Sequence, residues 1–210
     1  MDKRAPVFKQ TIATYLEQIE QIDHEPLPEQ LGVKVAGRTV IVPFLGRRYR
    51  VSGEKICDES GQAPGYALSV LLCKYLLLCP AGRPVGGQWL SYKDFRDAAP
   101  LVTFFTNSIE RRIAAFFSGK KAGLHDAARA LGCRPAPIDL MADFSGCFDP
   151  LPRIPVLLVV NDADEDFAAR CTLLFEKRAA GFLDMECLAM VGGLLADRLT
   201  GDDRADRQLR

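Results

Sequence analysis

The sequence predicts an α+β protein in which a mainly antiparallel sheet packs against a central buried helix and several amphipathic helices. Segments with helical periodicity and segments rich in β-branched and aromatic residues follow one another in blocks, in the order helix, strands, helices, strands, helix. The helix expected over residues 64–79 is apolar on nearly all sides, so we place it at the centre of the core. Together these two observations indicate the α+β class.

Residues 1–30 are predicted to form an N-terminal helix and a linker. Apolar residues recur at helical spacing within residues 7–22, and the two prolines of residues 24–30 then end the helix. We expect residues 31–200 to form a single α+β domain and residues 201–210 to be a polar tail.

The expected domain begins with short β-rich runs over residues 32–61. Gly37, Gly46 and Gly53 separate these runs, which predicts a small antiparallel meander. The buried helix follows, with Pro64 suited to its first turn, and the motif PAGRP ends it.

Two further helices are predicted in the middle of the chain. Residues 108–118 have helical character, with Ser108 as the N-cap. Residues 121–131 form the second helix, which Gly132 closes.

The last third of the chain is predicted to hold strands and a final helix. Strand character returns over residues 137–162 and continues over residues 167–176. Asp184 is placed to cap a helix over residues 185–199. The glycine pair at residues 192–193 lies inside this helix, where each glycine costs about 1 kcal/mol relative to alanine. We therefore expect another backbone to pack closely against the pair.

Four carboxylates separate two of the apolar runs. They are Asp162, Asp164, Glu165 and Asp166. A calcium loop that began at Asp162 would need glycine at its sixth position and glutamate at its twelfth, where this chain has Phe167 and Leu173. Asparagine and aspartate favour turns through local hydrogen bonds, so we interpret the segment as the tip of a hairpin rather than as a metal site.

The composition excludes several classes of partner. Lys+Arg and Asp+Glu number 27 each, so the formal net charge is zero and no global field attracts nucleic acid or an anionic membrane. The most apolar segment, residues 66–79, is too short to span a bilayer and carries Lys74 in its middle. No apolar run follows the charged N-terminus, which argues against a secretory signal. We therefore predict a cytoplasmic protein with neither a nucleic-acid nor a membrane partner.

The 7 cysteines do not predict a metal site on this chain. Their number is odd, and no two of them form a C-x-x-C pair. Cys73 and Cys79 would point about 120° apart on one helix, so they could not clamp one ion by themselves. We interpret the cysteines as free, mostly buried thiols in a reducing compartment, and we predict no cofactor bound by this chain. A cluster assembled from distant cysteines stays open as the alternative.

The candidate binding residues are Gly87, Trp89, Tyr92 and Arg111. Gly87 belongs to a glycine pair that frees the backbone in a loop over residues 85–95. Trp89, the only tryptophan, and Tyr92 bring broad apolar faces with polar ends. Arg111 belongs to an arginine pair that could hold a carboxylate or a phosphate. The alternative for Trp89 is a cap on the core beneath the loop.

Three segments carry a resemblance to a known family. They are LLCKYLLLCPAGRPVGGQWLSYKDF (residues 71–95), AARALGCRP (residues 127–135) and the stretch from PLPRIPVLLVVNDADEDF to MVGGLLADRL (residues 150–199). In this order they resemble domain-of-unknown-function family 3786, from about Gly32 to Leu199. Members of that family occur mainly in anaerobic bacteria and archaea, and some carry the domain behind a small iron–sulfur module like that of corrinoid iron–sulfur proteins.

The resemblance implies a cytosolic setting near corrinoid or iron–sulfur chemistry, and it implies no activity. This chain has no cluster of cysteines before residue 57, so an iron–sulfur cluster or a corrinoid would have to come from a partner. The sequence has neither a G-x-S-x-G elbow nor a phosphate loop, and His24 and His125 lie far apart. The first hypothesis is therefore a binding or accessory domain for a metallocofactor protein. The alternative is a small-molecule enzyme whose site is built from dispersed residues.

Overall fold

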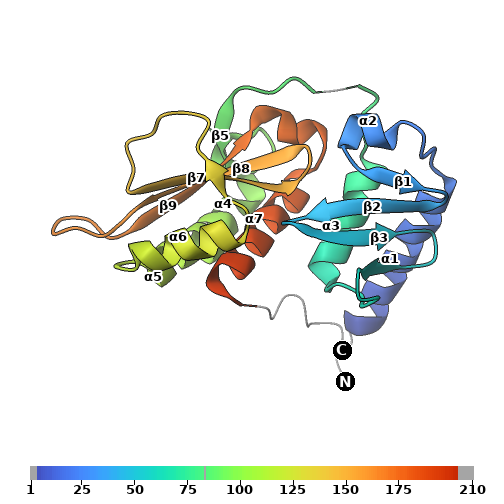
Figure 1. Ribbon diagram of the computed structural model, residues 1–210, viewed down its shortest axis with the longest axis horizontal. Helices are drawn as coiled ribbons and strands as arrows, with labels where there is room; N and C mark the ends of the chain where they lie inside the picture. Colours follow the sequence, from blue (N-terminus) through green and yellow to red (C-terminus); the bar gives the residue numbers. More distant parts are fainter. Residues whose placement is uncertain (1–3, 83, 203–210) are drawn as a thin grey trace.

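Two antiparallel sheets lie towards opposite ends of the molecule, with helices packed between and beneath them (Figure 1). The computed structural model describes residues 4–82 and 84–202, so the predicted polar tail lies outside the described residues from residue 203 onwards. One sheet has the strand order β1-β2-β3-β4, and the other has the order β5-β9-β8-β7-β6. The strand pairs in both sheets are antiparallel, which confirms the predicted α+β class.

The N-terminal half builds the smaller sheet and the helices that cover it. In chain order its elements are α1 (Arg4–Gln21), α2 (Leu27–Leu31), β1 (Lys34–Ala36), β2 (Thr39–Phe44), β3 (Arg47–Val51), β4 (Ile56–Asp58) and α3 (Tyr66–Leu77). Each strand pairs with the next one, so the predicted meander is confirmed. Val40, Val42 and Phe44 alternate with more exposed residues along β2 and form the core side of this sheet.

The segment predicted as a linker contains α2. The helix α1 ends before the two prolines, as predicted, but Pro26 and Pro28 then start a second helix instead of an irregular linker. Leu27 and Leu31 are buried in the core, and their burial makes so short a helix stable.

The helix α3 lies in the core, which confirms the predicted buried helix. Leu71, Leu72 and Tyr75 are fully buried along it. The Tyr75 hydroxyl donates to the carbonyl oxygen of Leu31 at 2.7 Å and accepts from the backbone N–H of Arg153 at 3.2 Å. This hydroxyl therefore connects α2 with the turn between two strands of the larger sheet. Within the described residues, no helix combines the length and the hydropathy needed to cross a membrane.

The C-terminal half builds the larger sheet. Its strands are β5 (Trp89–Ser91), β6 (Arg134–Pro135), β7 (Phe144–Leu151), β8 (Ile154–Asn161) and β9 (Arg170–Glu176). Residues 85–95, predicted as a loop, thus contain a strand, because β9 pairs with Trp89–Ser91 as an edge strand. So short a segment cannot show the alternation on which a strand prediction relies.

The strands β8 and β9 form the predicted hairpin. Their register pairs Leu158 with Leu173 and Asn161 with Arg170, so residues 162–169 form the tip. Most of β8 is buried on both faces, which explains its continuous apolar sequence.

Helical segments surround the larger sheet. The helical segments of this half are η1 (Tyr92–Asp94), η2 (Ala99–Leu101), α4 (Val102–Phe105), η3 (Thr106–Glu110), α5 (Arg111–Phe117), α6 (Lys121–Ala130), η4 (Lys177–Gly181) and α7 (Met185–Thr200). Of these, η3, α5 and α6 pack directly against its strands. The α6 helix agrees with the prediction for residues 121–131, and Gly132 follows it with a φ of 73°.

The segments α4, η3 and α5 form one helical run, in which η3 is a π-helical turn. The prediction that this helix begins at Ser108 is wrong, because Ser108 lies inside η3 and not at a helix start. Side chains at intervals of four residues are buried along the run: Phe105, Ile109, Ile113 and Phe117. On an α-helix, residues four positions apart are rotated by about 40° from each other, so such a row would turn away from the core. The wider π turn offsets this rotation and keeps the four side chains on one face.

The final helix α7 begins as predicted. Asp184 is its N-cap, and the Oδ1 atom accepts a hydrogen bond from the backbone N–H of Cys187 at 2.8 Å. The expectation of a close backbone at the glycine pair is wrong, because the close neighbour is an aromatic ring. A Cβ atom on Gly192 would lie 2.8 Å from the ring of Phe105. Gly192 therefore makes room for the side chain that anchors α4.

Candidate functional site

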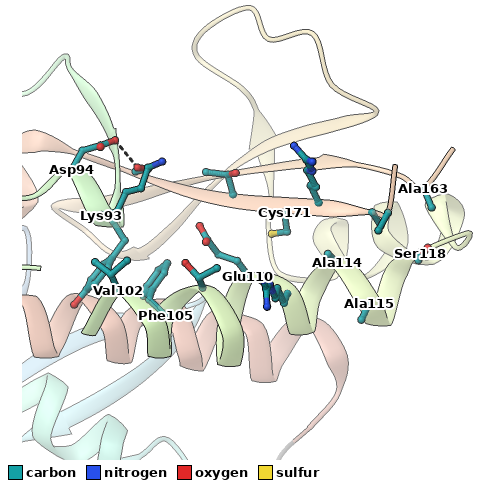
Figure 2. Close-up of a pocket in the computed structure, with 18 residues that line it drawn as sticks. Lys93, Asp94, Val102, Phe105, Glu110, Ala114, Ala115, Ser118, Ala163 and Cys171 are labelled. Carbon is teal, nitrogen blue, oxygen red and sulfur yellow. Dashed lines mark hydrogen bonds between the residues drawn. The ribbon is translucent and has the colours of Figure 1, made fainter. Parts of the chain in front are cut away.

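A groove runs along one side of the larger sheet, between the helical run α4–η3–α5 and the edge of β9 (Figure 2). We call it the edge groove. Its volume is about 1120 Å³. Lys93 and Asp94 lie at one end of it, Ser118 and Ala163 lie at the other, and Glu110 points from the helical run towards the strand (Figure 2).

The upper wall of the edge groove is a segment of β9 that extends past the end of β5. The last pair between these strands joins Ser91 to Leu174, so residues 170–173 of β9 continue along the groove beyond β5. The backbone N–H of Leu173 donates to Glu110 Oε1 at 3.1 Å and therefore points into the groove. In an antiparallel strand the same side is presented at every second residue, so the N–H and C=O of Cys171 also point towards the groove.

Glu110 is the half-buried carboxylate of the site. It lies at the end of the π-helical turn η3, and π turns recur at functional sites. Burial raises its pKa above the ordinary value of 4.5, although hydrogen bonds from Leu173 and Thr106 and the charge of Lys93 act in the opposite direction. Its hydrogen-bonding capacity is therefore partly used within the protein.

Three cations line the edge groove: Lys93, Arg111 and Arg170. All three are exposed, and none takes part in an ion pair among the described residues. The guanidinium group of Arg170 lies over the ring of Phe167, 5.6 Å from its centroid. The Asp94 carboxylate, by contrast, accepts a hydrogen bond from the Ser91 hydroxyl (Figure 2). The described lining thus holds three cationic side chains and two carboxylates, Asp94 and Glu110.

Cys171 lies in the wall of the groove as a buried thiol. The residue is 8% exposed, and burial, followed by the charge of Glu110, raises the pKa of the thiol far above its ordinary value of 9.0. This shift favours the neutral thiol over the thiolate at pH 7.

The hairpin tip, residues 162–169, lies at the far end of the groove and is hydrogen-bonded to the turn between α5 and α6. The Asp162 carboxylate accepts from the backbone N–H of Gly119 at 2.9 and 3.1 Å, and these bonds help to lower its pKa. The Asp164 carboxylate accepts from the backbone N–H groups of Asp166 and Phe167 at 2.9 and 2.7 Å. In residues 4–82 and 84–202, no three histidine, cysteine or acidic side chains gather in a way that could hold a metal ion.

The comparison with protein families matches the chain over residues 23–198 to a model described as Domain of unknown function (DUF3786). The chain belongs to this family. The match begins after α1 and includes all the elements that form the edge groove. It confirms the resemblance seen in the sequence. No curated protein and no solved structure matches this DUF3786 chain.

Two of the four candidate residues predicted from the sequence line the edge groove of the DUF3786 domain, Tyr92 and Arg111. Tyr92 is mainly a core residue, since only 2% of it is exposed and its ring stacks on Phe105 at a centroid distance of 4.1 Å. Its hydroxyl donates to the carbonyl oxygen of Met185 at 2.7 Å. Burial, together with the charges of Asp184 and Glu186, raises the pKa of Tyr92 to about 12. Arg111 is exposed on α5 and free to meet a ligand.

The other two candidates are not brought into the groove. Gly87 is exposed before β5 with a φ of 120°, a conformation that favours glycine. Trp89 is half-buried in β5 and pairs with Glu176. It faces away from Leu90 and Phe175, hence away from the core side of the sheet. Its placement matches neither a fully buried cap nor a residue that lines this groove.

Sequence reasoning missed Glu110 and the free edge of β9. Glu110 resembles any charged residue on a solvated helix face until β9 is placed beside it. The available signal is its position directly after Ile109, which belongs to the buried series along the helical run of this DUF3786 protein. The free edge has no sequence signal, because it depends on where β5 ends.

Proposed function

We propose that this protein is a binding or accessory domain that holds an extended segment of a partner protein in the edge groove. The observation that carries the proposal is the segment of β9 beyond Ser91, where backbone groups face an open groove instead of a neighbouring strand. Exposed strand edges are common docking sites for extended peptides, because the main chain supplies ready hydrogen bonds.

The chemistry of the groove supports binding rather than covalent catalysis. Burial favours the neutral form of its cysteine, and its half-buried carboxylate, Glu110, already accepts hydrogen bonds from Leu173 and Thr106. No histidine is among the described residues that line it. His24 hydrogen-bonds to the carbonyl oxygen of Ile19 at 2.9 Å, and the His125 ring packs edge-on against Phe144.

The family points to the class of partner. Because some members carry the domain behind an iron–sulfur module, a corrinoid or iron–sulfur protein of an anaerobe is the first candidate, and the partner would supply the cofactor. The zero net charge of the chain supports a protein partner over nucleic acid or a membrane. The cytosolic setting that the family resemblance implies supports a cytoplasmic location.

An anaerobic binding experiment tests this function. The purified, tagged protein is incubated with an anaerobic extract of the source cells, retained proteins are identified by mass spectrometry, and their absorption spectrum is recorded. Ala115→Trp fills the groove from the exposed side of α5. Ala122→Trp is the matched control, because Ala122 is also exposed but lies on α6, outside the groove lining. We expect a corrinoid or iron–sulfur protein to be retained by the parent and the control and to be lost from Ala115→Trp.

Equal retention by both variants would show that the groove is not the binding site. Glu110 gives the alternative, a small-molecule enzyme, one specific support, since a carboxylate with a raised pKa beside Lys93 could act as a general base. Native mass spectrometry of the same preparation distinguishes the two, because a bound metabolite adds less mass than any protein segment.

A further inference from the structure

We infer that the edge groove binds an acidic, extended peptide segment that adds as a strand to β9 in the place where β5 ends. This inference rests on the proposed function and states the chemistry and the geometry of the occupant. Three features of the groove lead to it.

The first feature is the geometry of the strand edge. β5 occupies the side of β9 from Leu174 to Glu176 and runs antiparallel to it. The side from residue 170 to residue 173 continues the same edge, and the backbone of Cys171 points into the groove there. A strand in this position would run in the direction of β5 and exchange hydrogen bonds with Cys171. A few residues suffice, because this part of the edge is roughly 14 Å long at the usual rise per residue.

The second feature is the small size of the side chains around the edge. Ala114 and Ala115 line the groove from α5, Ser118 lines it just after α5 ends, and Ala168 and Ala169 line it from the hairpin tip. Small side chains leave room for a main chain to approach the strand edge. Glu110 accepts the hydrogen bond of the Leu173 N–H. The backbone N–H and C=O of Cys171, the next residue that faces the groove, can then pair with the occupant.

The third feature is the charge. Lys93, Arg111 and Arg170 come from three different elements, and they are spread along the groove without ion-pair partners among the residues described. Two carboxylates also line the groove, Asp94 and Glu110, so its cationic side chains outnumber its acidic ones by one. The carboxylates already accept hydrogen bonds from Ser91 and Leu173, whereas the three cations take part in no ion pair within the described part of the chain, so acidic side chains on the occupant would complement the lining.

A peptide titration tests the inference. The probe is an acetylated, amidated octapeptide of alternating alanine and glutamate, and its counterpart has lysine in place of glutamate. Binding is followed by the amide signals of the isotope-labelled full chain, and protection of the Cys171 amide by its hydrogen-exchange rate. We expect the glutamate peptide to bind at least about tenfold more tightly than the lysine peptide, and to slow exchange at Cys171 by at least about tenfold.

N-methylation tests strand addition itself. Methyl groups on the backbone nitrogens of the alanines, or of the glutamates, remove the donors from one edge of the peptide only. One of these two peptides should lose binding and the other should keep it. Arg170→Glu should weaken the glutamate peptide about fivefold or more, whereas Arg48→Glu, an exposed charge reversal in the smaller sheet, should leave binding unchanged.

The following outcomes would overturn the inference. Equal affinity for the glutamate and lysine peptides would contradict an acidic occupant. Loss of binding by both methylated peptides, or by neither, would contradict strand addition. No binding at about 1 mM peptide would contradict both parts of the inference. A dimer of the protein alone that pairs through residues 170–173 assigns the edge to a second copy. In any of these cases the proposed function still stands if a partner is retained by the parent and lost from Ala115→Trp.

Discussion

The carboxylate of Glu110 accepts a hydrogen bond from the backbone N–H of Leu173 at 3.1 Å, and this bond joins the π turn of the helical run to the edge of β9. The glutamate thus covers one outward-facing backbone group of a strand edge that is otherwise open towards the groove. Replacing Glu110 with glutamine removes the charge of this side chain and keeps its size, so the substitution isolates the effect of the charge on stability.

Glu110→Gln should change how stability depends on pH. The pKa of Glu110 is raised above 4.5, so the folded protein holds this proton more tightly than the unfolded chain. The parent therefore loses stability as the pH rises from about 4.5 through the raised folded value, and glutamine does not. Each tenfold change in the acid constant corresponds to about 1.4 kcal/mol. Urea unfolding at pH 4, 5, 6 and 7 measures the difference, and parallel pH profiles for the two proteins would contradict the prediction.

Gly192→Ala and Gly193→Ala should have opposite effects although the residues are neighbours in α7. A Cβ atom at Gly192 would lie 2.8 Å from the Phe105 ring, so alanine should cost about 1–3 kcal/mol through overpacking. At Gly193 the nearest neighbour, Ile109, lies 3.8 Å away, so the gain in helix propensity should stabilise the protein by up to about 1 kcal/mol. Thermal unfolding of the two variants gives the comparison, and stabilisation by Gly192→Ala would show that Phe105 can shift freely.

Leu72→Ala should destabilise the protein by about 2–5 kcal/mol, because Leu72 is fully buried on α3 and truncation leaves a cavity. Leu78→Ala provides the control in the same apolar segment, since Leu78 is 37% exposed just after the helix and should cost much less. Chemical denaturation measures both. Similar costs for the two substitutions would mean that α3 is not the central helix of the core.

Asp162→Ala should loosen the turn between α5 and α6, whereas Asp166→Ala should not. The Asp162 carboxylate accepts from the backbone N–H of Gly119 across a long sequence separation, and Asp166 lies in the same tip. Hydrogen exchange at the Gly119 amide should therefore become faster in Asp162→Ala only. The pKa of Asp162 is lowered, so this restraint is present above the ordinary aspartate pKa and weakens as the pH falls through the folded value. Unchanged exchange at Gly119 would leave the tip without a structural role.

The sequence predicted the elements whose own periodicity is strong. The buried helix α3, the amphipathic helix α6, the capped helix α7 and the hairpin of β8 and β9 all follow from patterns within a single segment. The start of α4 was missed because its buried residues recur every four positions, which fits an α-helix poorly until a π turn is included.

The edge groove could be predicted only in part. Tyr92 and Arg111 were proposed from residue chemistry, and both line it. Glu110 and Cys171 were not, because they meet only when β9 is laid beside a helical run that lies some 60 positions earlier in the chain. A site made by two distant segments leaves no local spacing for a sequence motif to record.

The hydroxyl group of Tyr75 has a consequence for how the chain unfolds. It donates to Leu31 on the side of the smaller sheet and accepts from Arg153 in the turn between β7 and β8. The backbone N–H of Leu45 donates to the carbonyl oxygen of Pro150 across the same junction at 3.1 Å. Neither half keeps these partners when the other one opens. The two sheets should therefore melt together in a single cooperative transition, and a protease that cuts between them should release no fragment that survives by itself.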